Sequence, residues 1–327
     1  MGGTGMGMMA QDDPGVADGH AGLLLDARGL VKSLGGVRVV DGVDLSCAPG
    51  EVLGLLGANG AGKTTALRMC YGFLTPDAGS IRIAGHDLAR EPDAARAALG
   101  VCTQDDTYDA DFTVRGNLEQ TGRYYRPRPH DLTARIDELL ERFGLMEYAN
   151  FVPEALSGGY RRRLMIARAV LHRPRVVFLD EPTTGLDPQA RAAVWELIAG
   201  LRTAGMAVVL TTHYMDEAER LSDRLLVLQA GRVRAAGLAH AILGDIVGEH
   251  IVVLPASGTE QVSRWLAGRG QKATVVLGTW HLALDAAGLA AFATAFPDLR
   301  YDLRAPTLDD LFPALAGSGA NGVGSAP

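Results

Sequence analysis

Hydrophobic and polar positions divide the chain into short aliphatic runs and longer amphipathic stretches. Between residue 23 and about residue 237 the two kinds of segment alternate. The aliphatic runs are EVLGLL from Glu51, VVFLD from Val176, AVVLTT from Ala207 and LLVLQAG from Leu225. Runs of this length, bounded by turns, are typical of strands that are buried on both faces. The pattern therefore predicts an α/β domain with a largely parallel sheet.

Two further segments have a different pattern of hydrophobic and polar residues. Residues 105–168 contain helical patterns such as TARIDELLERFGLMEYA and no strand-like run, which predicts a helical subdomain. In residues 241–316 the alternating runs HIVVL, ATVVL and HLALD precede the helical stretch LAAFATAF, which predicts a small α+β accessory domain. Residues 1–22 and 317–327 are of low complexity and are predicted to be disordered.

Composition and charge narrow the choice of partners. The 327 residues have a formal net charge of -7, so the chain lacks the general excess of basic residues that binds nucleic acid. Nucleic acid is therefore not expected as a partner. No run reaches the roughly 18 to 20 apolar residues of a membrane span, which predicts a cytoplasmic chain. The three cysteines lack the spacing of a zinc site or a disulfide framework and are predicted to be reduced structural residues.

A glycine-rich loop follows the first aliphatic run. Its sequence GANGAGKTT matches G-x-x-x-x-G-K-[ST], in which backbone N–H groups and a helix amino end converge on phosphates. Lys63 supplies a positive charge for the β and γ phosphates, and the Thr64 hydroxyl suits Mg2+. A chance match is disfavoured because lysine occurs only three times in the chain. The predicted nucleoside triphosphate site comprises Gly57, Ala58, Asn59, Gly60, Ala61, Gly62, Lys63, Thr64 and Thr65.

An acidic pair ends the second aliphatic run, at the edge of a parallel sheet where ligands normally bind. We expect Asp180 to hold Mg2+ and Glu181 to polarise the attacking water, a role that typically contributes about 100- to 10,000-fold. Taken alone, the pair is equally compatible with a turn or a helix cap.

Further sequence features occur in a fixed order around this pair. LSGGYRRRL precedes it from Leu156, TTGLD follows as far as Asp187, and TTH ends at His213. With Gln104 and the phosphate loop, these features resemble the ABC ATPase family from residue 23 to about residue 237. The resemblance implies an ATP-binding domain over residues 23–240, with a mostly parallel P-loop core, an antiparallel β subdomain and a helical subdomain.

The resemblance also implies roles for individual residues. Gln104 would sense Mg2+ and the attacking water, and His213 would hold the γ-phosphate; either one alone would be taken as a structural polar group. Asp187 would bridge two subunits. A head-to-tail homodimer is implied, in which the γ-phosphate of ATP on one subunit is contacted by Ser157, Gly158 and Gly159 of the other.

Some positions depart from the family pattern or have no assigned role. Leu34 stands where many relatives carry an aromatic residue that stacks on adenine, so part of the about 1 to 3 kcal/mol of base stacking should be lost. Tyr160 replaces the glutamine of the family signature, and we expect the phosphate contact to survive because Ser157 and both glycines are kept. The arginines at 161–163 are predicted to form a solvated basic face of the helix.

Three stretches indicate a branch of the family. QDDTYDADFTVRGNL from Gln104, TTHYMDEAERLSDRLLVLQAGRV from Thr211 and RAPTLDDLF from Arg304 resemble daunorubicin-resistance-type and nodulation-type exporters. Such ATPases pair with a separate ABC-2 type permease. The resemblance implies that the chain lies peripherally on the cytoplasmic face of the membrane through this permease. The implied cargo is a hydrophobic compound, drug or lipid-linked glycan.

Export has three alternatives. An importer ATPase would share the same nucleotide chemistry. A soluble ABC protein acting on ribosomes or DNA is less favoured, because the chain has neither two cassettes nor a long coiled coil. A P-loop kinase or GTPase lacks support, since no NKxD-like base reader accompanies the loop. For the accessory domain, dimer stabilisation, permease contact and simple packing remain open.

Overall fold

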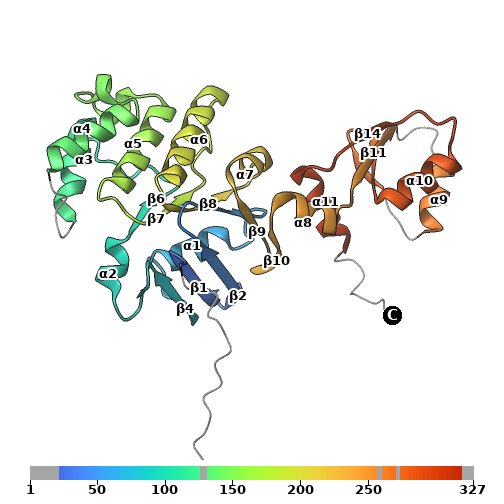
Figure 1. The fold of residues 1–327 in the computed structure, drawn as a ribbon, viewed down its shortest axis with the longest axis horizontal. Coiled ribbons are helices and arrows are strands. Elements are labelled where there is room, and N and C mark those ends of the chain that lie inside the picture. Colours follow the sequence, from blue (N-terminus) through green and yellow to red (C-terminus); the bar gives the residue numbers. More distant parts are fainter. Residues whose placement is uncertain (1–21, 126–130, 256–259, 270–272, 319–327) are drawn as a thin grey trace, which may run out of the picture.

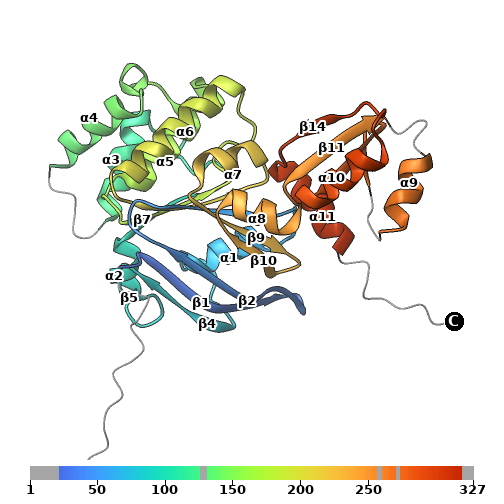
Figure 2. The same ribbon diagram turned by 45° about the vertical axis from the view of Figure 1, so that its right-hand side comes forward.

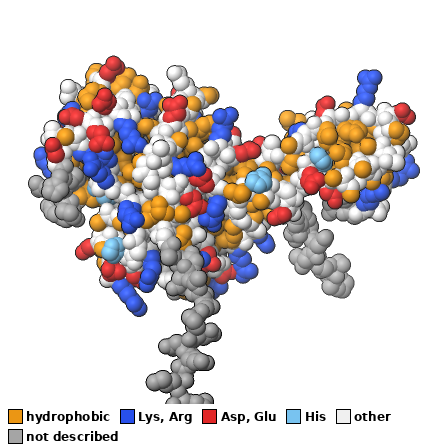
Figure 3. Space-filling model, in the orientation of Figure 1, with side chains coloured by type: hydrophobic (Ala, Val, Ile, Leu, Met, Phe, Trp, Pro, Cys, Tyr) orange, Lys and Arg blue, Asp and Glu red, His pale blue; other side chains and the backbone are white. Residues whose placement is uncertain are grey.

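The chain forms a large lobe and a smaller C-terminal lobe joined by a narrower waist (Figures 1 and 3). The computed structural model describes residues 22–125, 131–255, 260–269 and 273–318. The segments predicted to be disordered, 1–22 and 317–327, lie outside these residues except for positions 22, 317 and 318. Positions 317 and 318 belong to the last helix, which runs two residues into the predicted tail.

A six-stranded sheet in the order β10-β9-β3-β8-β7-β6 forms the centre of the large lobe. All neighbouring pairs are parallel except β9 and β10. The strands are β3 (Val52–Leu56), β6 (Leu99–Cys102), β7 (Val176–Asp180), β8 (Ala207–Thr212), β9 (Arg224–Gln229) and β10 (Arg232–Gly237). Every residue of β3, β7 and β8 is buried, as their aliphatic sequences require. The predicted α/β fold with a mostly parallel sheet is confirmed.

An antiparallel sheet in the order β2-β1-β4-β5 lies beside this core. Its strands are β1 (Leu25–Leu34), β2 (Val37–Cys47), β4 (Ala78–Ile83) and β5 (His86–Asp87). Helix α1 (Lys63–Cys70) shares one hydrophobic core with both sheets, in which Leu30, Leu67 and Phe178 are buried together. Helix α2 (Pro92–Ala97) follows β5. This packing fixes the start of α1 between the two sheets.

Among the described residues between β6 and β7, helices are the only regular elements. They are α3 (Val114–Tyr124), α4 (Leu132–Arg142), η1 (Met146–Tyr148), η2 (Pro153–Ala155) and α5 (Gly158–Val170). In α4, Ile136, Leu139 and Leu140 are buried at helical spacing. They share a core with α5, with α6 (Pro188–Thr203) and with one face of the central sheet. The helical region is therefore packed onto the strands that carry the candidate site.

The C-terminal lobe has a ferredoxin-like arrangement, which is more specific than the predicted α+β domain. Its strands pair antiparallel in the order β12-β13-β11-β14, and the chain order is β-α-β-β-α-β. Helices α9 and α10 pack on one face through Val262, Leu266 and Phe292 (Figure 2). The elements are β11 (His250–Pro255), α9 (Glu260–Ala267), β12 (Thr274–Val276), β13 (Thr279–Leu284), α10 (Ala286–Ala295) and β14 (Asp302–Arg304).

Three helices lie between the two lobes or at their boundary. They are α7 (Met215–Leu221), α8 (Ala239–Ile246) and α11 (Leu308–Ser318). Within the described ranges, no helix has the length and apolar character needed to cross a membrane.

The three cysteines are free and buried. Burial raises the pKa of Cys47 and of Cys70 to about 12. The pKa of Cys102 is raised for the same reason, although the neighbouring Arg162 opposes the shift. The prediction of reduced structural cysteines is confirmed.

His172 is expected to make stability fall in mild acid. Its ring stacks on Tyr125 at a centroid distance of 3.8 Å, and its Nε2 lies 2.9 Å from the Leu99 carbonyl oxygen. Burial lowers the pKa of His172 to about 4. An unfolded histidine titrates near 6.5, so between these values the unfolded chain binds more protons, and stability falls as the pH drops through this window.

We expect His172 to account for a loss of about 2 to 3 kcal/mol in the free energy of unfolding between pH 7 and pH 4.5. Urea denaturation at both pH values measures this loss, and other groups will add to it. The variant His172→Phe keeps an aromatic ring and removes the titrating group, so its loss should be smaller by that amount. Equal losses in the two proteins would contradict the assignment.

Candidate functional site

The glycine-rich loop connects β3 to α1 and fits closely against neighbouring backbone. A Cβ on Gly57 would lie 2.6 Å from the Leu228 carbonyl oxygen, and one on Gly62 would lie 2.6 Å from the Val39 carbonyl oxygen. Gly62 also has a φ of 104°, which disfavours any other residue. No side chain caps the amino end of α1. The exposed N–H groups and the helix dipole therefore suit a phosphate group.

Lys63 is the first residue of α1, and its side chain is only 5% exposed. Its Nζ donates hydrogen bonds to the carbonyl oxygens of Gly57 at 2.7 Å and Ala58 at 3.2 Å. Burial lowers the pKa of Lys63, while the carboxylates of Glu181 and Asp180 oppose the shift. The lysine is thus positioned within the loop that is expected to surround the phosphates.

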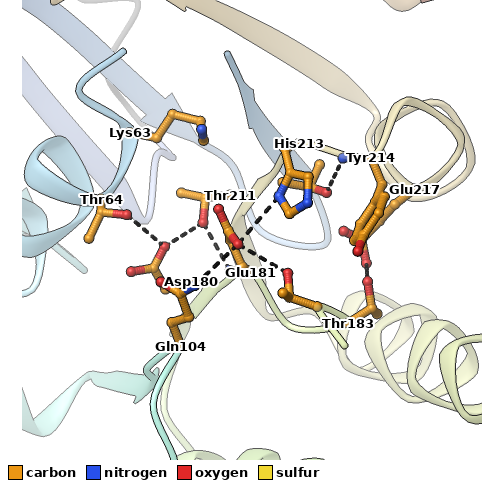
Figure 4. A network of polar contacts seen from close by, with 12 residues as sticks. Lys63, Thr64, Gln104, Asp180, Glu181, Thr183, Thr211, His213, Tyr214 and Glu217 are labelled. Atoms are coloured by element: carbon orange, nitrogen blue, oxygen red, sulfur yellow. Dashed lines mark hydrogen bonds and ion pairs between the residues drawn. The ribbon is translucent and has the colours of Figure 1, made fainter. Parts of the chain in front are cut away.

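Asp180, at the end of β7, is buried and bound to two hydroxyl groups (Figure 4). Its Oδ1 accepts hydrogen bonds from Thr211 at 2.5 Å and from Thr64 at 3.2 Å. A hydroxyl and a carboxylate that converge in this way are hard oxygen ligands, and Mg2+ is usually held by one or two such groups together with phosphate oxygens. The residues present therefore fit a Mg2+ ion.

Glu181 forms the centre of a second group of polar contacts (Figure 4). Its Oε2 accepts hydrogen bonds from Thr184 Oγ1 at 3.0 Å and Gln104 Nε2 at 3.4 Å, and His213 Nδ1 lies 3.3 Å away. The backbone of Glu181 has a φ of 46°, a strained conformation that its N–H stabilises by donating to Thr211 Oγ1 at 3.0 Å. Residues from three separate segments thus meet at one carboxylate.

These groups face a cleft of about 560 Å3. It is lined by Val39, Asn59, Gly60, Ala61, Gly62, Lys63, Thr64, Thr65, Gln104, Glu181, Thr184 and His213. The predicted adenine contact Leu34 is not among these lining residues; it ends β1 and is 44% exposed, whereas Val39 of β2 lines the cleft. The structure therefore brings the phosphate, metal and hydrolytic residues together and leaves Leu34 at their margin.

The residues of the signature lie elsewhere. Ser157, Gly158 and Gly159 begin α5, and none of them lines the cleft. Ser157 is exposed at the N-cap position, but its side chain makes no capping hydrogen bond. A Cβ on Gly159 would lie 2.7 Å from Ala190 Cβ, so the start of α5 packs tightly on the start of α6. A second uncapped helix amino end therefore lies outside the cleft that Lys63 lines.

Asp187 caps α6, since its Oδ1 accepts a hydrogen bond from the Ala190 N–H at 2.9 Å. This contact is a complete structural reason for an aspartate at this position. A role in bridging two subunits remains a prediction.

The predicted solvated basic face is wrong for Arg162, which is only 6% exposed. Its guanidinium donates to the carbonyl oxygens of Thr103 at 2.8 Å and Gln104 at 3.0 Å. These acceptors lie just after β6, so a residue near the start of α5 holds the backbone that carries Gln104. The physical reason is that α5 packs on the sheet along the side that presents Arg162.

Glu217 is a candidate functional residue that sequence reasoning missed. It is fully buried in α7, and its Oε1 accepts hydrogen bonds from Thr183 Oγ1 at 2.7 Å and Trp195 Nε1 at 3.2 Å. Glu217 thus connects the helix that follows His213 with the segment between Glu181 and Asp187. The sequence signal that could have identified Glu217 is an acidic residue at a helix position that faces the core.

Replacement of Glu217 by alanine is expected to destabilise the protein. The buried Thr183 hydroxyl would lose its acceptor, which costs about 1 to 3 kcal/mol for that donor alone. The variant Glu217→Gln keeps an acceptor oxygen and should cost less. Urea denaturation of both variants measures the difference, and equal stabilities of Glu217→Ala and wild type would contradict the role of these bonds.

Leu34→Tyr is expected to tighten ATP binding if the end of β1 contacts the base. Stacking of a base on an aromatic ring contributes about 1 to 3 kcal/mol, so a gain of up to that size is expected. The dissociation constant for ATP measures it, with Val37→Tyr on the same hairpin as a control for added aromatic surface. An unchanged or weaker constant would remove Leu34 from the base site.

Comparisons with known proteins agree with this geometry. A family model described as ABC transporter matches residues 40–184. The Nod factor export ATP-binding protein I of Paraburkholderia xenovorans is 42% identical over 287 residues, which cover 88% of this chain and 94% of the relative. The protein of the same name from Rhizobium johnstonii is 40% identical over 294 residues, covering 90% of this chain and 94% of that protein.

A solved structure of the ATP-binding subunit of an ABC transporter has a TM-score of 0.62 and 30% identity. The match covers 68% of this chain and 92% of that one. Family and fold therefore agree with the assembled loop, acidic pair and histidine. The chain belongs to the ABC transporter family, as an ATP-binding subunit whose ATP hydrolysis is coupled to transport.

Proposed function

We propose that this chain is the motor subunit of an exporter, working as a head-to-tail homodimer on a separate membrane permease. ATP with Mg2+ would lie between two copies, and its hydrolysis would reset the dimer. The observation that carries this proposal is the division of the site: Lys63, Thr64 and Glu181 line the cleft, while the start of α5 lies outside it. Each half would be completed by the other copy.

The residues of the chain have distinct roles in this scheme. Backbone N–H groups of the loop and Lys63 would bind the phosphates, with Thr64 and Asp180 as ligands for Mg2+. The metal, when bound, would neutralise phosphate charge. Glu181 would accept a proton from the attacking water, and Gln104 and His213 would orient that water and the terminal phosphate through their contacts with Glu181.

The second copy would supply the amino end of α5. Because no side chain caps this helix end, its N–H groups and the Ser157 hydroxyl are available to an anion. A homodimer with two-fold symmetry would place this end over the cleft of its mate in both directions, giving two equivalent sites.

An apolar surface on the helical region would serve as the docking site for the permease. Phe112, Phe151 and Val152 are exposed beside the start of α3, where the Val114 N–H donates to the Phe151 carbonyl oxygen at 2.9 Å. This apolar surface lies at the end of the loop that leaves Gln104. Partner binding there would reach the hydrolytic site through the backbone that Arg162 holds. Docking on the permease would place the chain on the cytoplasmic face of the membrane.

The direction of transport and the class of cargo rest on the relatives. The two reported relatives are named for export of Nod factor, and they match the chain across both lobes. We therefore favour export of a hydrophobic compound, drug or lipid-linked glycan over import.

Co-purification with an ABC-2 type permease tests the proposal. Recovery of the chain in membranes only when that permease is present, with ATPase activity raised by it, is the expected result. A matched variant, Phe151→Glu, should lower membrane recovery, while Tyr124→Glu at another exposed position of the same region should not. Recovery with ribosomes or DNA and never with membranes would overturn the proposal, and a requirement for a solute-binding protein would indicate import.

A further inference from the structure

Helix α11 of the C-terminal lobe packs back onto the nucleotide-binding lobe (Figures 1 and 2). Leu308 and Leu311 are fully buried in one hydrophobic cluster with Leu56, the last residue of β3 before the glycine-rich loop. Phe312 and Leu315 pack against the same cluster. Helix α11 therefore shares a hydrophobic core with the strand that leads into the phosphate loop.

Phe312 shares a small cavity with the loop itself. It is half-buried and lines a cavity of about 150 Å3 together with Ala58, Asn59, Gly60 and Ala61. The remaining wall is Leu228, Gln229 and Ala230, at the end of β9 and in the turn that follows it. In the same turn, the Gly231 N–H donates to the Ala61 carbonyl oxygen at 3.1 Å. The loop is thus hydrogen-bonded to this turn, and an aromatic side chain of the other lobe lines the cavity beside it.

The same cluster includes the helix that follows His213. Ala218 of α7 is fully buried in it, and Met215, two residues after His213, packs against it. Helix α11 therefore packs on the hydrophobic core next to two groups that are expected to hold the phosphates. These groups are the glycine-rich loop and His213. The contacts of α11 with this cluster are hydrophobic, and the α11 residues in the cluster do not line the nucleotide cleft.

We propose that Phe312 is a positioning residue for ATP: it holds the backbone of residues 58–61 in the conformation that receives the phosphates. The inference rests on ATP binding at this loop. Phosphate binding by backbone N–H groups depends on their direction, so a loop that loses its support should bind ATP more weakly. The C-terminal lobe would then be a working part of the ATP site.

The test is the dissociation constant of Mg-ATP for the full-length chain, measured with a fluorescent ATP analogue and by competition with ATP. Phe312→Ala should raise this constant by about 2- to 30-fold, the range expected for a residue that acts through packing. Phe312→Leu, which restores apolar bulk, should bind within about twofold of wild type. The turnover rate at saturating ATP should change less than the dissociation constant.

Phe296→Ala is the matched control. Phe296 is a half-buried phenylalanine of the same lobe, and it packs on Trp265 and Phe292, away from the loop. The variant Phe296→Ala should lower the melting temperature without changing the dissociation constant for Mg-ATP. An unchanged constant in Phe312→Ala, or an equal increase in Phe296→Ala, would overturn the proposal. If Phe312→Ala does not fold, Phe312→Val is judged by the same criterion. Failure of the wild type to bind ATP would instead count against the ATPase assignment itself.

Discussion

Glu181→Gln is expected to bind ATP as tightly as wild type and to lower turnover by about 100- to 10,000-fold, the contribution of a positioned general base. Glutamine has the same shape and keeps an oxygen that can accept the hydrogen bond from Thr184 Oγ1, 3.0 Å from the carboxylate. It cannot accept a proton from water. Because the cleft is otherwise unchanged, ATP should remain bound and hold two copies together.

Two measurements separate these outcomes. Release of phosphate measures turnover, and light scattering in the presence of Mg-ATP measures the dimer. Glu196→Gln, at an exposed position of α6, controls for the loss of one negative charge and should retain full turnover. Wild-type turnover in Glu181→Gln would refute the assigned base. A strictly monomeric variant, saturated with Mg-ATP and supplied with its permease, would refute the shared site.

Mixing two inactive variants should restore activity. Lys63→Ala removes the charge beside the phosphates, and a lost electrostatic contact of this kind costs about 100- to 1,000-fold in turnover. Ser157→Arg places a large side chain at the start of α5, where Ser157 is exposed and makes no capping bond, so the fold should tolerate it. Each homodimer would have two defective sites.

A mixed dimer would have one intact site, made from the unchanged Lys63 of one copy and the unchanged Ser157 of the other. With equal amounts, half of the dimers are mixed and half of their sites are intact, so about a quarter of wild-type activity is expected. ATPase assays of each variant alone and of the refolded mixture give the comparison. A mixture as inactive as its components would show that Lys63 and Ser157 do not act across two copies.

Features carried by consecutive residues could be predicted from the sequence. The phosphate loop, Asp180 and Glu181 lie at the ends of strands whose aliphatic runs are continuous, so local order already places them at one sheet edge. Gln104 and His213 could be assigned only through resemblance, because a single polar residue after a strand has many possible roles. The structure brings both within 3.4 Å of Glu181.

Features that depend on contacts between distant residues could not be predicted. Arg162 was expected in solvent, but it binds carbonyl oxygens 58 and 59 positions earlier in the chain. Glu217 meets Thr183 across 34 positions. Phe312 and residues 58–61 line one cavity although they belong to different lobes. Periodicity indicates which face of a helix is buried but not which partner it meets, and these assignments required the packed structure.

The burial of all three cysteines makes the chain suitable for thiol labelling. With a pKa of about 12, the Cys47 and Cys70 thiols are almost entirely protonated at neutral pH, and maleimides react with the thiolate. A single cysteine introduced on the surface would therefore be the main position to carry a dye or a spin label. Spectroscopic distances between two such labels could follow the approach and separation of the copies without first removing any native cysteine.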